Sequence, residues 1–450
     1  MSRRLSSAPR PAVLLSALIL SLWSAGVSAQ TLTAAYEVAL PSLNPELSPL
    51  AEENLPILCD RLMLAFGRDY GAYLVDHVDR DLHEGMAVYY LRQELQAFID
   101  MWRATGKGAY LDQARDLTLQ AIQEATAQSQ PLLWHGEYRG LWPCFYLESV
   151  QAQTGGHNQL ADFQGSAGFL MVARALQQIN EPQWKDIADF VERQVVEKWL
   201  FYKPSITPEQ LTGSQSNRYI LTVLNGARDV REHFAGICLD LNQLGYRDYP
   251  YWQWGKLLTD VYLTPRYDPN DAAPHQEELL DRVPNNWGLF VHTTPEGYTW
   301  LAVPNYDPNK LGEPMDTSHS NRTVWLAARA YSEGLIDSCV IDGLVNTLRY
   351  RIWAPEKGPF YFNNYVDGSD GEMDGLGHGR AGNVWFGWHR LAPYDEELTA
   401  LFLSMAYDLT NGGENLPEGA QNKKMVNAAT CLEAWAVRLL DARGQPLVFP

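Results

Sequence analysis

Apolar residues recur at spacings of three and four along most of this chain, and this pattern constrains its fold more than any other feature. Such spacing is typical of amphipathic helices that bury one face. The segments that show it are Glu52–Phe66, His83–Trp102, Tyr110–Ala125, Leu141–Gln153, Ala161–Gln177, Trp184–Trp199, Val230–Leu244, Trp252–Tyr262, Thr323–Glu333, Ser338–Trp353, Glu396–Tyr407 and Met425–Leu440. Connectors rich in Gly, Pro and Asn separate them, as at Tyr202–Asn217 and Thr264–Asn286. No strict sequence period links the segments, which argues against a solenoid of the TPR or ankyrin type.

Helices in antiparallel pairs can close into a ring that buries their apolar faces and collects the longer loops on one side. We therefore expect an all-α fold, an (α/α)6 six-hairpin toroid with long loops and short β-hairpins on one face. The turn at 103–111 resembles the hairpin junction of six-hairpin carbohydrate-active enzymes, through Thr105, Gly106, Tyr110 and Leu111. That superfamily includes polysaccharide lyases, uronate epimerases and glycosidases. The resemblance covers most of the chain by helix count but only short stretches by motif, and it implies a carbohydrate substrate.

The first 29 residues are typical of a secretory signal peptide. Arg3, Arg4 and Arg10 precede the apolar run Ala12–Trp23, and Val27-Ser28-Ala29 supplies small residues at a cleavage point. We expect residues 30–450 to form one toroidal catalytic domain that is secreted or periplasmic. No later stretch reaches about 18 apolar residues, so we expect no membrane association after cleavage.

Charge and aromatic content narrow the partners. The chain carries 35 Lys and Arg against 54 Asp and Glu, a net charge of -19. This acidity argues against nucleic acid and against anionic membranes, which both favour clustered cations. Trp and Tyr, at 15 and 23, outnumber the 14 Phe, and they suit surfaces that are partly apolar and partly wet. We expect a polysaccharide or oligosaccharide substrate.

The motifs of common cofactor and metal sites are missing from the sequence. It contains no P-loop, no H-E-x-x-H, no G-x-G-x-x-G and no G-x-S-x-G. Its five Cys are widely spaced with no C-x-x-C, which excludes zinc ribbons and redox motifs of that type. We expect mostly buried thiols with at most two disulfides, no cofactor and no metal.

Two segments concentrate the residues of acid–base chemistry. The first is 134–142, where Trp134, His135, Glu137, Tyr138 and Arg139 lie close together. We expect this loop to form a wall that stacks on sugar and transfers protons; the alternative is a buried turn in which Glu137 and Arg139 pair.

The second segment is Asp316–Arg322, just ahead of a predicted helix. Asp316 or Ser318 is a natural cap for that helix. His319 has the chemistry of a base near neutral pH, while Asn321 and Arg322 have donors for a carboxylate or enolate oxygen. The Asp-x-Ser-His order resembles phrases in six-hairpin lyases and uronate epimerases. Asn321 also begins a glycosylation sequon, which we take as accidental.

The third and fourth segments supply further loop residues. Between 358 and 390 we expect a long loop over a cleft, in which Tyr361 and Tyr365 are candidate acids. In the same loop His378, Arg380 and Arg390 are candidate carboxylate clamps, and Asn364 and Trp385 candidate sugar contacts. Its Asp and Gly spacing fails the EF-hand pattern, because Glu372 stands where Gly is required. Around Trp287 the alternating aromatics favour a short strand pair at the mouth, with His292 in a structural role.

Three functions fit these residues, and a polysaccharide lyase that cleaves a uronic-acid-containing glycan by β-elimination fits best. A lyase needs an acid and a base together with a group that neutralises the substrate carboxylate. The candidate catalytic residues are His319, Tyr365, His135, Arg322 and Asn321. The second function, a glycoside hydrolase, needs two carboxylates roughly 5–10 Å apart; Glu137, Asp316, Asp367, Asp370 and Asp374 are the candidates. The third function is a non-catalytic periplasmic glycan-binding or assembly protein.

Overall fold

The computed structural model describes most of the central part of the chain. The described residues are 87–105, 108–134, 137–145, 156–201, 206–224, 228–267, 288–305, 313–370, 382, 384, 387–395, 397–398, 401–402 and 405. The expected signal peptide and the predicted segments Glu52–Phe66 and Met425–Leu440 lie outside them.

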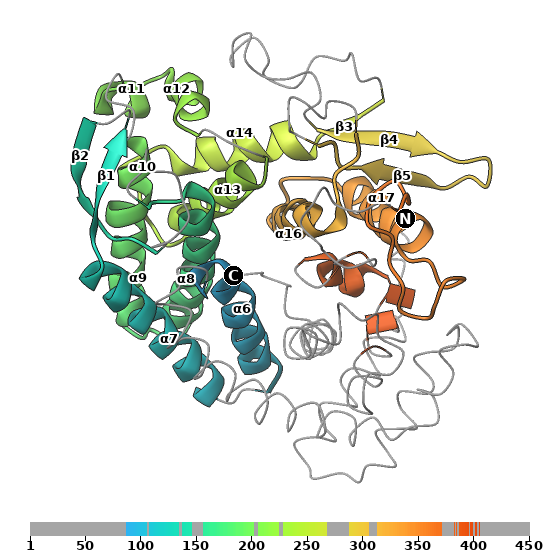
Figure 1. The fold of residues 1–450 in the computed structure, drawn as a ribbon, viewed down its shortest axis with the longest axis horizontal. Helices are drawn as coiled ribbons and strands as arrows, with labels where there is room; N and C mark the ends of the chain where they lie inside the picture. The colour runs from blue at the N-terminus through green and yellow to red at the C-terminus, as the bar shows by residue number, and fades with distance from the viewer. Residues whose placement is uncertain are drawn as a thin grey trace, which may run out of the picture.

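The described chain is largely helical, with a few small sheets, and its helices follow one another as hairpins. The pairs are α6 (Ala87–Thr105) with α7 (Gly108–Ala127), α8 (Gln159–Gln178) with α9 (Gln183–Phe190), α13 (Arg228–Gln243) with α14 (Tyr251–Leu263), and α16 (Thr317–Ser332) with α17 (Ser338–Thr347). The π-helix η3 (Val191–Val196) and α10 (Glu197–Leu200) extend α9, and the π-helix η4 (Leu348–Ile352) extends α17. The first helices of successive pairs pack on one another in chain order, and Figure 1 shows α7 and α9 on their outer side.

Short elements fill the connections. The strands β1 (Gln130–Trp134) and β2 (Glu137–Trp142) form an antiparallel hairpin. The strands β3 (Pro265–Arg266), β4 (Leu289–Thr293) and β5 (Thr299–Ala302) form a second sheet. The helices α11 (Pro208–Thr212) and α12 (Ser216–Val223) lie in and after the predicted connector Tyr202–Asn217, and the 3-10 helix η5 (Trp388–Tyr394) follows later.

Two sequence predictions are corrected here. The helix predicted over Leu141–Gln153 is wrong at its start, because Leu141 and Trp142 complete the register of β2. The connector also contains a capping box that we overlooked. Thr207 Oγ1 accepts from the Gln210 N–H, and the Gln210 side chain accepts from the Thr207 N–H, so α11 begins there.

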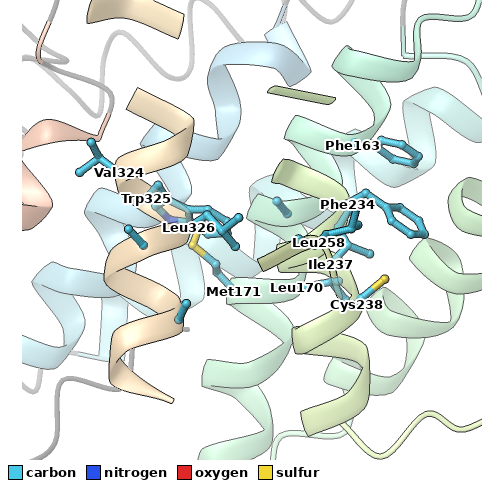
Figure 2. Packing of buried hydrophobic residues seen from close by; sticks show 14 of the residues in the cluster. Phe163, Leu170, Met171, Phe234, Ile237, Cys238, Leu258, Val324, Trp325 and Leu326 are labelled. Carbon is cyan, nitrogen blue, oxygen red and sulfur yellow. The ribbon is translucent and has the colours of Figure 1, made fainter. Parts of the chain in front are cut away.

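The core lies between the first helices of the pairs. Figure 2 shows Met171 of α8 and Phe234 of α13 packed among buried side chains that include Trp325 of α16. Gly236 makes this close packing possible, because a Cβ there would lie 2.6 Å from the Trp325 ring. Gly168 plays the same part between α8 and α6, where a Cβ would lie 2.9 Å from the Cα of Arg92. The first helices of the pairs therefore approach one another at positions where only glycine fits.

Residues far apart in the sequence also meet in this core. Arg390 Nη2 of η5 lies 2.9 Å from Asp100 Oδ2 of α6, and both side chains are buried. The Arg92 guanidinium of α6 lies over the Trp325 ring at 4.1 Å. The first described helix thus contacts both α16 and the segment near the end of the described chain.

Three other findings concern the whole described region. Among its residues, no helix is both long and apolar enough to cross a membrane. Cys144 and Cys238 are buried, whereas Cys339 is exposed. The remaining two Cys lie outside the described residues.

Candidate active site

The N-terminus of α16 is built on Asp316. Its Oδ1 accepts hydrogen bonds from the backbone N–H groups of Ser318 and His319, each at 3.0 Å, and so caps the helix. Its Oδ2 lies 2.7 Å from Nδ1 of His319. Residues three apart stand above one another on a helix, which brings the imidazole over the cap. One carboxylate therefore starts the helix and orients the histidine.

The electrostatics of this pair keep the Asp316 carboxylate ionised beside the imidazole. Burial alone would raise the pKa of Asp316, but hydrogen bonding and charge from His319, together with the Ser318 hydroxyl, lower that pKa to about 2. The ionised carboxylate accepts from the N–H at Nδ1 of His319, and in the neutral imidazole this tautomer leaves the lone pair on Nε2. The His319 side chain is 38% exposed, and no hydrogen bond to its Nε2 is formed by the described residues. The imidazole is therefore both oriented and accessible.

The backbone places the segment of Tyr365 against this helix start. Asp316 and Tyr365 form an antiparallel bridge, and the Thr317 N–H donates to the Asn364 carbonyl at 2.8 Å. Side chains of opposed residues in an antiparallel pair project to the same side. Tyr365 therefore shares the face of the Asp316 side chain, and both Tyr365 and Asn364 are half-buried. Two segments separated by more than 40 residues in the sequence supply one site.

Tyr361 belongs to a neighbouring charged cluster. Its hydroxyl donates to Asp370 Oδ2 at 3.0 Å, and Lys357 Nζ lies 2.8 Å from the same oxygen. Burial, followed by the hydrogen bond to Asp370, raises the pKa of Tyr361. Its proton is therefore committed to Asp370, whereas Tyr365 lies on the segment that bridges to Asp316.

Asn321 and Arg322 face the interior. Asn321 is 1% exposed; its Nδ2 donates to the Ser318 carbonyl at 3.1 Å, and its Oδ1 accepts from the Trp388 N–H at 3.1 Å. Arg322 donates through Nε and Nη2 to Gln164 Oε1 of α8, at 3.2 and 3.0 Å. Both side chains join neighbouring elements, and a buried Asn321 cannot serve as a glycosylation acceptor.

Glycines allow the backbone of the third segment (358–390) to pack closely against this site. A Cβ at Gly387 would lie 2.2 Å from the Asn321 carbonyl oxygen, and one at Gly382 would lie 2.0 Å from the carbonyl oxygen of Asn363. Trp388 is fully buried, and its Nε1 donates to the Thr317 carbonyl at 3.1 Å. The start of η5 thus packs directly on the helix that carries His319, while Arg390 pairs with Asp100 inside the fold.

The first segment lies elsewhere. Glu137, Tyr138 and Arg139 are in the β1–β2 hairpin, which Figure 1 shows at the far edge of the fold from α16. Arg139 pairs with Glu137, and Tyr138 is 64% exposed. The structure therefore does not bring these residues together with His319. The fourth segment forms the expected strand pair, β4–β5, in which the His292 ring stacks on Trp300 at 4.4 Å.

Several predicted site residues lie outside the described region. These are His135, Trp287, His378, Arg380 and Trp385, and of Trp134 only the backbone is described. Within the described residues, no group of three or more His, Cys, Asp or Glu side chains is placed to hold a metal ion.

Sequence reasoning missed a buried polar layer behind the site. His233 Nε2 of α13 lies 3.0 Å from Gln164 Oε1, the same oxygen that accepts from Arg322. Burial, with the nearby charges of Arg92 and Arg322, lowers the pKa of His233 well below its usual range, so this histidine is neutral. It donates from Nε2 to the amide oxygen, which orients Gln164 toward Arg322. Gln164 and His233 occur within helical patterns that resemble ordinary core faces, so nothing in their spacing marked them.

Comparison with known proteins adds no further constraint. No family model, no curated protein and no solved structure matches this chain.

Proposed function

We propose that this chain is a secreted or periplasmic carbohydrate-active enzyme, a polysaccharide lyase that cleaves a uronic-acid-containing glycan by β-elimination. The observation that carries the proposal is the pairing of His319 Nδ1 with Asp316 Oδ2 at 2.7 Å, with the imidazole 38% exposed and the backbone of Tyr365 bridged to that of Asp316. A histidine base oriented by a carboxylate, with a tyrosine on the adjoining segment, fits proton abstraction from carbon together with protonation of a leaving oxygen.

In the proposed reaction His319 Nε2 removes the proton on the carbon next to the substrate carboxylate. The electron pair forms a C=C bond as the glycosidic C–O bond breaks, and Tyr365 donates its proton to the departing oxygen. Asp316 stabilises the imidazolium that forms, because its carboxylate is charged throughout.

Neutralisation of the substrate carboxylate falls to other residues than we first expected. Asn321 and Arg322 are buried and form hydrogen bonds with neighbouring elements. They therefore position α16 and do not contact the substrate. Asn364 is half-buried beside Tyr365 and is the amide within the described residues that fits this part. His378 and Arg380 remain the expected cationic donors of the same loop.

The arrangement of carboxylates favours the lyase over a hydrolase. Asp316 is committed to His319, Asp370 to Lys357 and Tyr361, and Glu137 to Arg139 on the distant hairpin. Asp367 accepts from the Ser369 N–H at 2.9 Å. No two of the described candidates are therefore set up as a free acid and a free nucleophile.

We also propose that the complete fold is the (α/α)6 six-hairpin toroid. Four successive hairpins with mutually packed first helices support this architecture. The buried contact between Asp100 and Arg390 supports closure of the ring, since it joins α6 to a segment 290 residues later.

The test is an assay of the purified protein on a panel of uronic-acid polymers and neutral glycans. A lyase produces ultraviolet absorbance from the new C=C bond conjugated to the carboxylate. New reducing ends without that absorbance would instead establish a hydrolase. Binding without either product would establish the non-catalytic glycan-binding protein and overturn the proposal.

A further inference from the structure

Arg351 in η4 forms no ion pair with any of the described residues. No carboxylate of the described residues lies within ion-pairing distance of it, whereas its neighbour Arg349 pairs with Asp395 at 3.0 Å and with Glu397. Arg351 is half-buried, and its Nε is buried without a hydrogen bond. The exposed Glu296 lies near enough for its charge to act on Arg351, but it does not contact the guanidinium. Partial withdrawal of a cation from water without a contacting carboxylate is unfavourable.

The Arg351 side chain is held in place by an aromatic surface. Its guanidinium lies over the Trp300 ring of β5 at 4.7 Å, and His292 of β4 stacks on the same indole at 17°. Tyr298 and Tyr350 stack on each other at 4.2 Å, and Tyr350 is 42% exposed. Stacking on Trp orients the planar guanidinium without using its N–H donors, which stay available for a bidentate anion.

This aromatic surface adjoins the candidate active site through a single segment. Asn363 donates through Nδ2 to the Arg351 carbonyl at 2.7 Å, and a Cβ at Gly368 would lie 3.5 Å from the Arg351 Cα. The same segment bridges to Asp316 at Tyr365. The backbones of Arg351 and Asp316 are therefore separated by about two strand spacings, roughly 10 Å.

We propose that Arg351 binds a carboxylate of an acidic glycan, at a subsite beside the one where His319 acts. The inference rests on the proposed function for the identity of the ligand, a polymer of uronic acids. The Tyr298–Tyr350 pair provides the aromatic surface on which an adjoining sugar ring packs. A polymer that spans both places presents one carboxylate near His319 and another to Arg351.

The experiment compares the binding of polygalacturonate and alginate with that of a neutral glycan, for the wild-type chain, Arg351→Gln and Arg351→Lys. The matched control is Arg247→Gln, since Arg247 is an exposed arginine that donates to the carbonyls of Asn242 and Tyr246. We expect Arg351→Gln to weaken binding of at least one of the acidic polymers about tenfold or more, as for loss of a charge-assisted hydrogen bond. Arg351→Lys should bind with intermediate affinity, and the control should bind as the wild type does.

Each outcome distinguishes this inference from the proposed function. Weaker binding by a folded Arg351→Gln, with no unsaturated product from the wild type, supports the subsite and overturns the lyase. Unsaturated product from the wild type, with unchanged binding by Arg351→Gln or an equal loss in the control, overturns the subsite alone. If Arg351→Gln fails to fold, the affinity of Arg351→Lys tests the subsite instead. Wild-type affinity in that variant would show that the planar guanidinium does not bind the carboxylate. A wild-type chain that binds no acidic polymer contradicts both.

Discussion

At the scale of single residues, Asp316 has two roles that are compatible: it caps α16 and it orients His319. As a helix cap it accepts hydrogen bonds from backbone N–H groups, and as the partner of His319 it has to keep its charge. The hydrogen bonds that cap the helix also lower the pKa of the carboxylate, so the helix start stabilises the form that the imidazole needs.

The first prediction concerns the pH dependence of this pair. The pKa of Asp316 is lowered to about 2 in the folded chain, against about 3.9 in an unfolded one. The stabilisation is therefore full above the unfolded value and is lost as the pH falls through the folded value. Asp316→Asn keeps a good cap but has no charge. We expect the stability difference between wild type and variant to shrink between about pH 4 and pH 2.

Urea unfolding at a series of pH values measures this difference. Because both proteins share every other titrating group, their difference reports Asp316 together with its coupling to His319. A difference that stays constant across the window would show that the capping hydrogen bonds, rather than the charge, account for the contribution of Asp316.

The sequence indicated Asp316 or Ser318 as the cap and His319 as a base at one helix start, because capping is a local rule. The contact between Asp316 and His319 follows from their spacing of three. The sequence misplaced Asn321 for a reason of phase. The helix begins at Thr317 rather than near Thr323, so Asn321 lies about 200° around the helix from His319 and faces the interior. The direction in which a helical side chain points depends on the residue at which the helix starts. Because this helix starts six residues before the predicted position, Asn321 is inside the helix rather than in the loop ahead of it.

At the scale of elements, the start of η5 depends on how closely its backbone approaches α16. The second prediction is that Gly387→Ala destabilises the fold by about 1–3 kcal/mol, because its Cβ would lie 2.2 Å from the Asn321 carbonyl oxygen. The matched control is Gly108→Ala at the start of α7, where nothing lies within 4 Å of the added Cβ. That control should be neutral or slightly stabilising.

Urea midpoints of the two variants test this prediction. Activity of Gly387→Ala on the glycan should fall as well, because the segment fixes Asn321 and Trp388 against the helix that carries His319. Equal stability of the two variants would mean that η5 can move away from α16 without cost.

The elements themselves were predicted unevenly from the sequence. Long amphipathic helices such as α8 and α13 were found within two residues of their ends, because the period of their buried faces is strong. The β1–β2 hairpin was expected to be a loop, since its pairing depends on a register that skips between Pro131 and Leu133. Short strands carry too few residues for a periodicity to be visible.

At the scale of the whole molecule, the buried pair of Asp100 and Arg390 joins the two ends of the described chain. The third prediction is that Asp100→Ala destabilises the protein by about 3–5 kcal/mol, because it leaves the Arg390 guanidinium buried without its counter-charge. Replacing both residues together, as Asp100→Leu with Arg390→Met, should recover part of that loss.

Equilibrium unfolding in urea provides the comparison. If the single variant loses no more than an exposed pair would, about 1 kcal/mol, the contact contributes little to the attachment of η5 to α6. The long separation of these residues explains why the sequence could not show their pairing.

The central claim is that His319 is the base of a β-elimination, and turnover of the glycan by His319→Ala tests it most directly. The imidazole is 38% exposed, so the variant should keep the circular dichroism of the wild type and lose only the part of its stability that the contact with Asp316 supplies. We predict that its rate on a uronic-acid polymer falls at least about 100-fold, as expected for loss of a general base. A folded His319→Ala that forms unsaturated product at the wild-type rate would contradict the account.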